Sequence, residues 1–191
     1  RKAAALGFIG VTFNHRFFAL DRLADAEADV QALIAFVRER ADEFGIDRDR
    51  IALWAFSGGG PLVSGFLCQP PGRVRALVFF YALMDLRAWL AQAKGQLDEA
   101  TAVRFSPLIA LEKAKEPAPP VFIGRAGLDN PGILATIDQF AALAKRKNLL
   151  LPLENHSQGL HGFDVYNNDA RTREIIHDAF NFLRTHLEKT D

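Results

Sequence analysis

The sequence predicts an α/β fold in which a mostly parallel sheet of about five strands is flanked by helices. Three observations support this prediction. Short runs of β-branched and aromatic residues alternate along the chain with longer segments of helical periodicity. These apolar runs contain little polar alternation, as expected for strands that are covered on both faces of a parallel sheet. The length of 191 residues suits one domain with a substantial core.

Five strands are expected, each in a short apolar run. Because parallel strands need crossover connections, helices are expected between them. The expected strands span residues 7–13, 51–56, 76–81, 121–124 and 149–153.

Residues 24–44 are expected to form the first long helix, because their apolar residues recur at helical spacing, with acids early and arginines late. The segment 85–115 is longer than a crossover needs, and we expect it to form a small lid-like insertion within a single domain that spans residues 1–191. Further helices are expected at 58–67, 86–93, 107–113, 131–146 and 170–187.

The composition excludes several classes of protein. Hydrophobic residues make up 49% and charged residues 24%, which excludes a disordered or fibrous chain. Lys+Arg and Asp+Glu each total 23, so we expect neither nucleic acid nor a membrane surface as a partner. The longest apolar run, 76–84, is about half as long as a membrane-spanning helix. The single cysteine, Cys68, allows no intrachain disulfide and no cysteine-based metal site, which fits a reducing, cytoplasmic location.

Ser57 is the first candidate functional residue, because ligands of parallel α/β sheets bind where the strands end. It follows the second expected strand in the run AFSGGGP, residues 55–61. This run matches the nucleophile motif G-x-S-x-G, except that Ala55 replaces the first glycine, and it has the required strand–turn–helix context. A plain turn or a phosphate cradle would also be glycine-rich, but the phosphate-binding patterns G-x-G-x-x-G and Gly-Lys-Ser/Thr are absent from the sequence. We therefore predict that Ser57 is a nucleophile.

A serine nucleophile needs a base, and the base needs a third group that orients it. Asp129 follows the fourth expected strand just before a helix, where the alternative role is a helix N-cap. His156 and His161 follow the fifth expected strand, where a solvated loop histidine is the alternative. The chain order serine, acid, histidine, with each residue past a strand end, favours a Ser57–Asp129–His161 triad.

Nearly the whole chain resembles the α/β-hydrolase superfamily, specifically its esterase and dienelactone-hydrolase-like branch. The resemblance rests mainly on the Ser57 turn and on the His-Gly-Phe run that begins at His161. Supporting motifs are VTFNHR at 11–16, FGIDRDRI at 44–51, SPL at 106–108 and GLD at 127–129. The resemblance implies that Ser57 is the nucleophile, His161 the general base and Asp129 the residue that orients the imidazole. His156 is the less favoured base, since no Gly-Phe follows it, and Asp85 is the alternative acid.

The same resemblance implies a carboxylesterase that cleaves small esters and uses neither a metal nor an organic cofactor. Dienelactone hydrolases proper have cysteine at the turn, so Ser57 points to ester-type acyl transfer. The N–H of Gly58 is expected to bind the oxyanion. Leu86, Trp89 and Leu90 are expected to line an apolar acyl pocket, although core or oligomer contacts would use the same residues.

The second oxyanion donor of this superfamily comes from a loop that is often marked by His-Gly-Gly, and no such run precedes Gly7. The resemblance therefore implies that three leading strands are missing, one of which would lie between 7–13 and 51–56. Because unpaired strand edges recruit other chains, we expect a homodimer or larger homo-oligomer through open sheet edges. Two alternatives stay open: a weakly active or non-catalytic remnant that binds a small ligand or a partner chain, and a piece of a longer protein.

Overall fold

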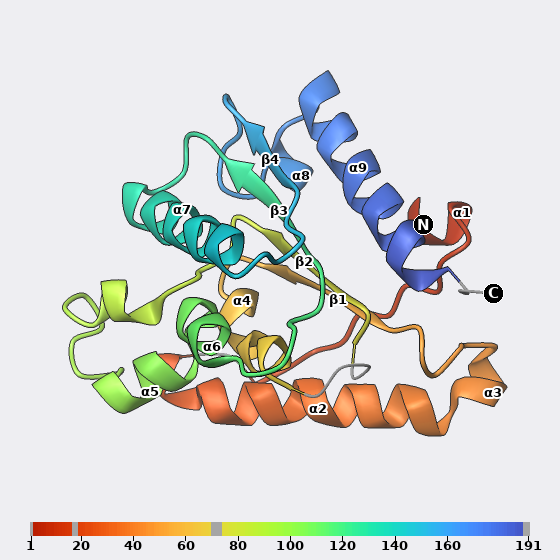
Figure 1. Cartoon of the computed structure of the whole chain (residues 1–191), viewed down its shortest axis with the longest axis horizontal. Helices are drawn as coiled ribbons and strands as arrows, with labels where there is room; N and C mark the ends of the chain where they lie inside the picture. The colour runs from red at the N-terminus through yellow and green to blue at the C-terminus, as the bar shows by residue number, and fades with distance from the viewer. Residues whose placement is uncertain (1, 17–18, 70–73, 189–191) are drawn as a thin grey trace.

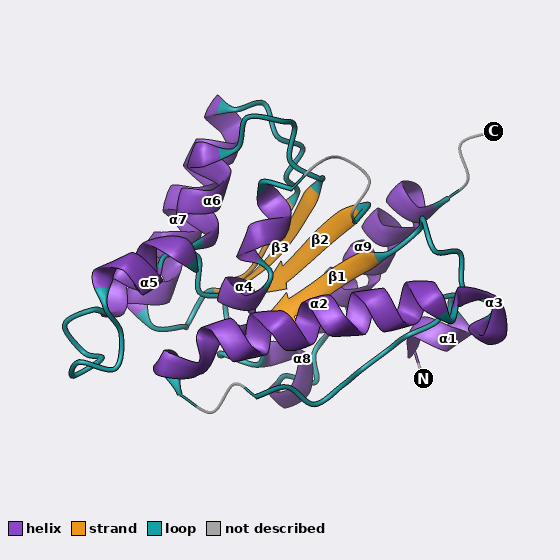
Figure 2. Ribbon diagram, turned by 90° about the horizontal axis from the view of Figure 1, so that it is seen from below, coloured by secondary structure: helices purple, strands orange, loops and turns teal. Residues whose placement is uncertain are grey.

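Four parallel strands form the sheet in the computed structural model, which describes residues 2–16, 19–69 and 74–188 (Figure 1). They lie in the order β1-β2-β3-β4, and every neighbouring pair is parallel, so their carboxyl ends meet at one edge of the sheet. Figure 2 shows the arrows of β1, β2 and β3 pointing the same way. The bounds are β1 Ala52–Phe56, β2 Ala76–Phe80, β3 Val121–Ala126 and β4 Leu153–His156.

Helices cover both faces of this sheet, which confirms the predicted α/β fold (Figure 1). The long helices are α2 (Leu23–Glu39), α7 (Pro131–Arg146) and α9 (Ala170–Leu187). The shorter ones are α1 (Lys2–Ala5), α3 (Ala41–Phe44), α4 (Gly59–Leu62), α5 (Glu99–Arg104), α6 (Pro107–Lys113) and α8 (Phe163–Tyr166), with 3₁₀ turns η1 (Leu20–Arg22), η2 (Ser64–Leu67) and η3 (Leu86–Trp89).

The strand β2 shows why the sequence has so little polar alternation. Its side chains at Leu77 and Phe79 enter the core with α2 and α7, whereas Val78 and Phe80 enter a second core with α9. All five residues of β2 are buried. A strand that is covered on both faces has no solvent-facing side and therefore needs no polar positions.

Several predicted elements are confirmed. Helices α6, α7 and α9 have the predicted bounds. The helix predicted at 24–44 is divided into α2 and α3 at Arg40, and the one predicted at 58–67 becomes α4 followed by η2.

Two strand predictions are wrong. The strand expected at 149–153 begins only at Leu153. Pro152 has no N–H to donate to a neighbouring strand, and only its carbonyl takes part, accepting from the N–H of Ile123 (2.9 Å). The segment 7–13 is irregular, with Ile9 55% and Val11 48% exposed. A strand needs a second strand to pair with, and no strand of the described residues pairs with this segment.

The segment 85–115 contains η3, α5 and α6. Helix α6 buries Ala110 and Leu111 in the core that also holds α2 and α7. An ion pair between Arg104 and Glu27 (2.6 Å) joins α5 to α2. The later part of the segment therefore packs on the body of the domain. None of the helices within the described ranges combines the length and hydropathy that a membrane-spanning helix requires.

Candidate active site

Ser57 lies at the turn between β1 and α4, in a left-handed backbone conformation (φ 49°) that L-residues rarely adopt. Two hydrogen bonds fix the turn: the N–H of Ser57 donates to the carbonyl of Phe80 (3.1 Å), and the N–H of Leu83 donates to the carbonyl of Ser57 (3.0 Å). A Cβ at Gly60 would lie 2.8 Å from the carbonyl oxygen of Leu83, so only glycine lets α4 start this close to the chain after β2. The sequence thus builds a strained, tightly supported serine turn.

A continuous chain of hydrogen bonds joins Ser57, His161 and Asp129. His161 Nε2 lies 2.8 Å from Ser57 Oγ, and His161 Nδ1 lies 2.7 Å from Asp129 Oδ2. An ionised carboxylate only accepts hydrogen bonds, so Nδ1–H donates to Asp129 and the lone pair of Nε2 faces the serine hydroxyl. The structure brings these three predicted residues together in the geometry that lets an imidazole take a proton from a serine.

The carboxylate of this hydrogen-bonded chain is buried, and the imidazole is open to solvent. The side chain of Asp129 is 3% exposed and that of His161 is 41% exposed. Asp129 Oδ1 also accepts from the N–H of Asn130 (2.7 Å), so both carboxylate oxygens have a donor. A buried carboxylate that is satisfied in this way holds one fixed orientation.

The loops that carry Asp129 and His161 are bonded to each other. The N–H of Gly127 donates to the carbonyl of His156 (2.8 Å), and the N–H of Leu128 donates to the carbonyl of Gly159 (2.9 Å). A Cβ at Gly127 would lie 2.8 Å from the His156 carbonyl oxygen, so glycine is needed for this approach. These contacts fix the distance between Asp129 and His161.

Residues 1–126 of the chain match the BD-FAE family. The chain belongs to this family. The match to BD-FAE includes the Ser57 turn and ends before Asp129 and His161. Membership of BD-FAE agrees with the resemblance to the esterase branch of the α/β-hydrolases that the motifs indicated.

A curated relative of this BD-FAE chain is the "Probable carboxylic ester hydrolase LipM" of Mycobacterium tuberculosis, which is 31% identical over 126 residues. That alignment covers 60% of this chain and 27% of LipM, so the chain spans about a quarter of the length of this relative.

Among solved structures, the thermophilic esterase Est2 of Thermogutta terrifontis has a TM-score of 0.70 at 22% identity, over 85% of this chain and 64% of its own. The carboxylesterase Cest-2923 of Lactobacillus plantarum WCFS1 has a TM-score of 0.72 at 18% identity, over 87% and 70%. These similarities show that this BD-FAE chain shares the fold of the two esterases.

The alternative base His156 is used elsewhere in this BD-FAE chain. It is buried, and its Nε2 lies 3.1 Å from the carboxylate of Asp169 and 3.1 Å from Thr172 Oγ1. Asp169 is the N-cap of α9 and accepts from the N–H of Thr172 (2.8 Å). His156 therefore supports the start of α9 and does not contact Ser57 through any of these bonds.

The alternative acid Asp85 is also committed to structure. It is buried, caps η3, pairs with Arg87 (2.7 Å) and accepts from Ser106 Oγ (3.0 Å). Burial alone would raise the pKa of Asp85, but the hydrogen bonds from Arg87 and Ser106 outweigh burial and hold it below the ordinary value. The carboxylate therefore joins the start of the segment 85–115 to Ser106, at the start of α6.

The remaining predicted site residues differ in their placement. Gly58 follows Ser57 directly and is the N-cap of α4. Leu86 is 1% exposed and belongs to the core, so it forms no wall of an open pocket in this structure. Trp89 and Leu90 are half-buried, and the Trp89 ring lies 3.8 Å from the position of a Cβ at Gly132, close along the chain to Asp129. The His15 ring lies beside that of Phe13, at 5.7 Å between centroids.

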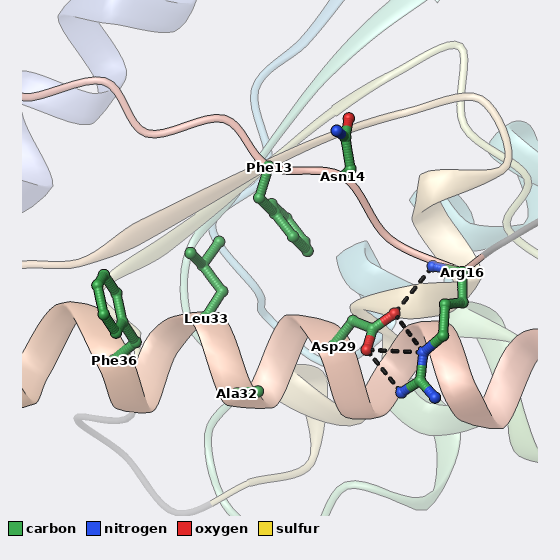
Figure 3. A pocket seen from close by; sticks show the side chains of 7 residues that line it. All are labelled: Phe13, Asn14, Arg16, Asp29, Ala32, Leu33 and Phe36. Carbon is green, nitrogen blue, oxygen red and sulfur yellow. Dashed lines mark hydrogen bonds and ion pairs between the residues drawn. The ribbon is translucent and has the colours of Figure 1, made fainter.

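A shallow hollow of about 470 Å³ lies between the segment 7–16 and α2 (Figure 3). Its two charged side chains pair with each other, Arg16 with Asp29 at 2.6 Å. None of its lining residues belongs to the Ser57–His161–Asp129 chain. Its walls are Phe13, Asn14, Arg16, Asp29, Ala32, Leu33 and Phe36. Among the described residues, no group of three or more His, Cys, Asp or Glu side chains is arranged to hold a metal ion.

Two residues near His161, Tyr81 and Asp164, are not among the site residues that the sequence predicts. Tyr81 reads as the last residue of an apolar strand, yet it lies past the end of β2 with its ring 4.7 Å from that of His161. Its hydroxyl donates to Asp164 Oδ1. The strand-end rule that identified Ser57 applies equally to Tyr81 and is the one signal that points to it.

Proposed function

We propose that this chain is a serine hydrolase that cleaves small carboxylic esters through an acyl-enzyme. The observation that carries the proposal is the hydrogen-bonded chain from Ser57 Oγ through His161 to Asp129, with distances of 2.8 and 2.7 Å. In a neutral imidazole held in this way, one nitrogen is fixed as donor and the other is free to act as a base.

The proposed reaction has two halves. Ser57 Oγ attacks the ester carbonyl while His161 Nε2 takes the hydroxyl proton, and Asp129 stabilises the imidazolium that forms. His161 returns the proton to the leaving alcohol, which leaves an acyl group on Ser57. Water then attacks this acyl group while His161 takes a proton from it; His161 passes that proton to Ser57 Oγ as the bond to the acyl carbon breaks, and the carboxylic acid leaves.

The N–H of Gly58 is proposed to bind the oxyanion that develops in each half. It is the one oxyanion donor that the sequence predicts. Removal of one such donor from a serine hydrolase lowers turnover by about 10²–10³-fold. We therefore expect slow turnover wherever Gly58 acts without a second donor.

Esters with short acyl groups are the proposed substrates. Solved structures of Est2 from Thermogutta terrifontis include complexes with butyrate and with propionate, and a form phosphonylated by sarin. A protein of the same fold that holds short carboxylates supports short-chain esters as the first substrates to test.

The test is hydrolysis of short-chain p-nitrophenyl esters together with labelling by a fluorophosphonate. The unmodified protein should hydrolyse the esters and carry the label on Ser57, because an activated serine reacts with both. Ser57→Ala should abolish both signals, whereas Ser157→Ala, which changes an exposed serine, should keep them. Unchanged turnover in Ser57→Ala would refute the mechanism. A folded protein that is never labelled would favour a non-catalytic, hydrolase-like binding protein.

We also propose that the chain assembles into a homodimer or larger homo-oligomer. Within the described residues β1 pairs only with β2, so its other edge is free. In the segment 7–13, three apolar residues are exposed: Ile9 by 55%, Val11 by 48% and Phe13 by 37%. Free edges and exposed apolar side chains favour pairing with a strand of a second copy.

A further inference from the structure

Tyr81 has an unusual backbone and an unusual hydrogen bond. It follows β2 directly, is 5% exposed, and adopts a left-handed conformation (φ 40°) that is strained for a bulky side chain. Its hydroxyl donates to the carboxylate of Asp164, which lies on α8 three residues after His161. Strain of this kind persists only where the surroundings enforce it, and it gathers at functional sites.

The ring of Tyr81 lies against the imidazole of His161. The two centroids are 4.7 Å apart and the planes meet at 57°. The ring of Tyr81 also packs edge-to-face on the ring of Phe163, with the two centroids 5.5 Å apart. The backbone N–H of Tyr81 donates to the carbonyl of Gly124 (2.8 Å). Tyr81 is thus held to β3 through its backbone and to α8 through its ring.

His161 needs a lateral support of this kind. Its side chain is 41% exposed, and its one bond to Asp129 fixes Nδ1 while leaving the ring able to swing about that contact. Proton transfer requires Nε2 to stay within hydrogen-bond reach of Ser57 Oγ, now 2.8 Å away. A ring packed against the imidazole restricts that swing.

We propose that Tyr81, held in place by Asp164, is a positioning residue that keeps the His161 imidazole aimed at Ser57. This inference rests on the proposed hydrolase function. The bond from Tyr81 to Asp164 joins the end of β2 to the helix that follows the base. The carbonyl of Phe80, the residue before Tyr81, accepts from the N–H of Ser57 (3.1 Å). The nucleophile turn and the base are therefore fixed to the same two residues of the chain.

The hydroxyl is suited to act as a permanent donor. Burial raises the pKa of Tyr81, and the hydrogen bond to Asp164 raises it further. The hydroxyl therefore keeps its proton throughout the pH range in which an imidazole base operates.

The experiment compares Tyr81→Phe, which keeps the ring and removes the bond, with Asp164→Ala and Asp164→Asn. Tyr81→Phe and Asp164→Ala should each lower kcat by on the order of tenfold with KM unchanged, since small errors in the position of a base reduce turnover steeply. Asp164→Asn keeps an oxygen acceptor and should restore most of the turnover. The matched control is Tyr166→Phe, because Tyr166 is 75% exposed and is the other of the two tyrosines.

The outcomes separate this inference from the proposed function. If Ser57→Ala abolishes turnover while Tyr81→Phe stays within twofold of the unmodified protein, the positioning role is wrong and the hydrolase proposal stands. If Ser57→Ala keeps full turnover, the hydrolase proposal itself fails. A Tyr81→Phe protein that loses its cooperative melting transition is replaced by Asp164→Ala, which breaks the same bond from the other side. The rate of fluorophosphonate labelling of Ser57 gives a second measure, and it should fall in parallel with kcat.

Discussion

Replacing Gly60 with alanine tests how closely the Ser57 turn must approach the chain after β2. The new Cβ would lie 2.8 Å from the Leu83 carbonyl oxygen and 3.0 Å from Ala82 Cβ, whereas ordinary contact begins near 3.4 Å. The backbone must therefore open by about 0.6 Å, because the nearest atom is a carbonyl that cannot rotate away. Overpacking of this kind costs about 1–3 kcal/mol of unfolding free energy.

The same displacement acts on the site. Ser57 lies three residues before Gly60, and its Oγ is 2.8 Å from His161 Nε2. A shift of this size would lengthen the contact towards the limit of a hydrogen bond. Since a misplacement of about 1 Å can cost about 10²-fold in rate, we expect turnover to fall between tenfold and a hundredfold.

Gly59→Ala is the matched control. The nearest atom to its new Cβ is Ala55 Cβ at 3.6 Å, an ordinary contact, and alanine favours a helix over glycine by up to about 1 kcal/mol. Urea unfolding should therefore show that Gly60→Ala lowers the stability, whereas Gly59→Ala keeps or raises it. Ester hydrolysis should be slow in the Gly60→Ala protein. Equal stability and turnover in the two variants would refute the close-approach argument.

Two further predictions concern titration and assembly. Burial raises the pKa of Tyr81 in the folded protein, so the hydroxyl keeps its proton there at high pH. In the unfolded chain the same hydroxyl has an ordinary pKa near 10 and loses its proton above that pH. The free energy of unfolding should therefore fall above about pH 10, by about 1 kcal/mol per pH unit. Urea unfolding at pH 9 and 11 should show this loss in the unmodified protein and a smaller one in Tyr81→Phe; identical losses in both would contradict the prediction. Sedimentation at micromolar concentration should give the mass of a dimer or a larger assembly, and Val11→Lys together with Phe13→Lys should shift it towards the monomer. A monomeric mass for the unmodified protein would rule out assembly through the free edge.

The sequence predicts the helices better than the strands, for a physical reason. Helices α7 and α9 carry their own end signals: Asn130 accepts from the N–H of Gly132 (2.8 Å), and Asp169 accepts from the N–H of Thr172 (2.8 Å). A strand depends on a neighbour that may be far away in sequence. The apolar run 7–13 has strand-like residues but no described strand beside it, and it forms no strand.

In the candidate site, too, residues with local sequence signals are predicted, and residues that depend on distant contacts are not. Ser57, Asp129 and His161 have local motifs and known places relative to strand ends, so the sequence identifies them. Tyr81 also follows a strand end but has no local motif, because its left-handed backbone and its bond to Asp164 arise only when β2 and α8 pack together. The burial of Leu86 likewise depends on how the segment 85–115 packs, and the apolar character of that residue does not distinguish a core from a pocket.

Ser57, the proposed nucleophile, follows an edge strand of the sheet. β2 and β3 each have two neighbours, but β1 has only one within the described chain, and three of its five residues are half-buried where all five of β2 are buried. The position of Ser57 is therefore set by its turn: the bonds with Phe80 and Leu83 and the close approach at Gly60. A strand that paired with the free edge of β1 would support the same turn from the other side. The proposed assembly and the proposed catalysis would be coupled at this point, because whatever orders β1 also orders the serine that follows it.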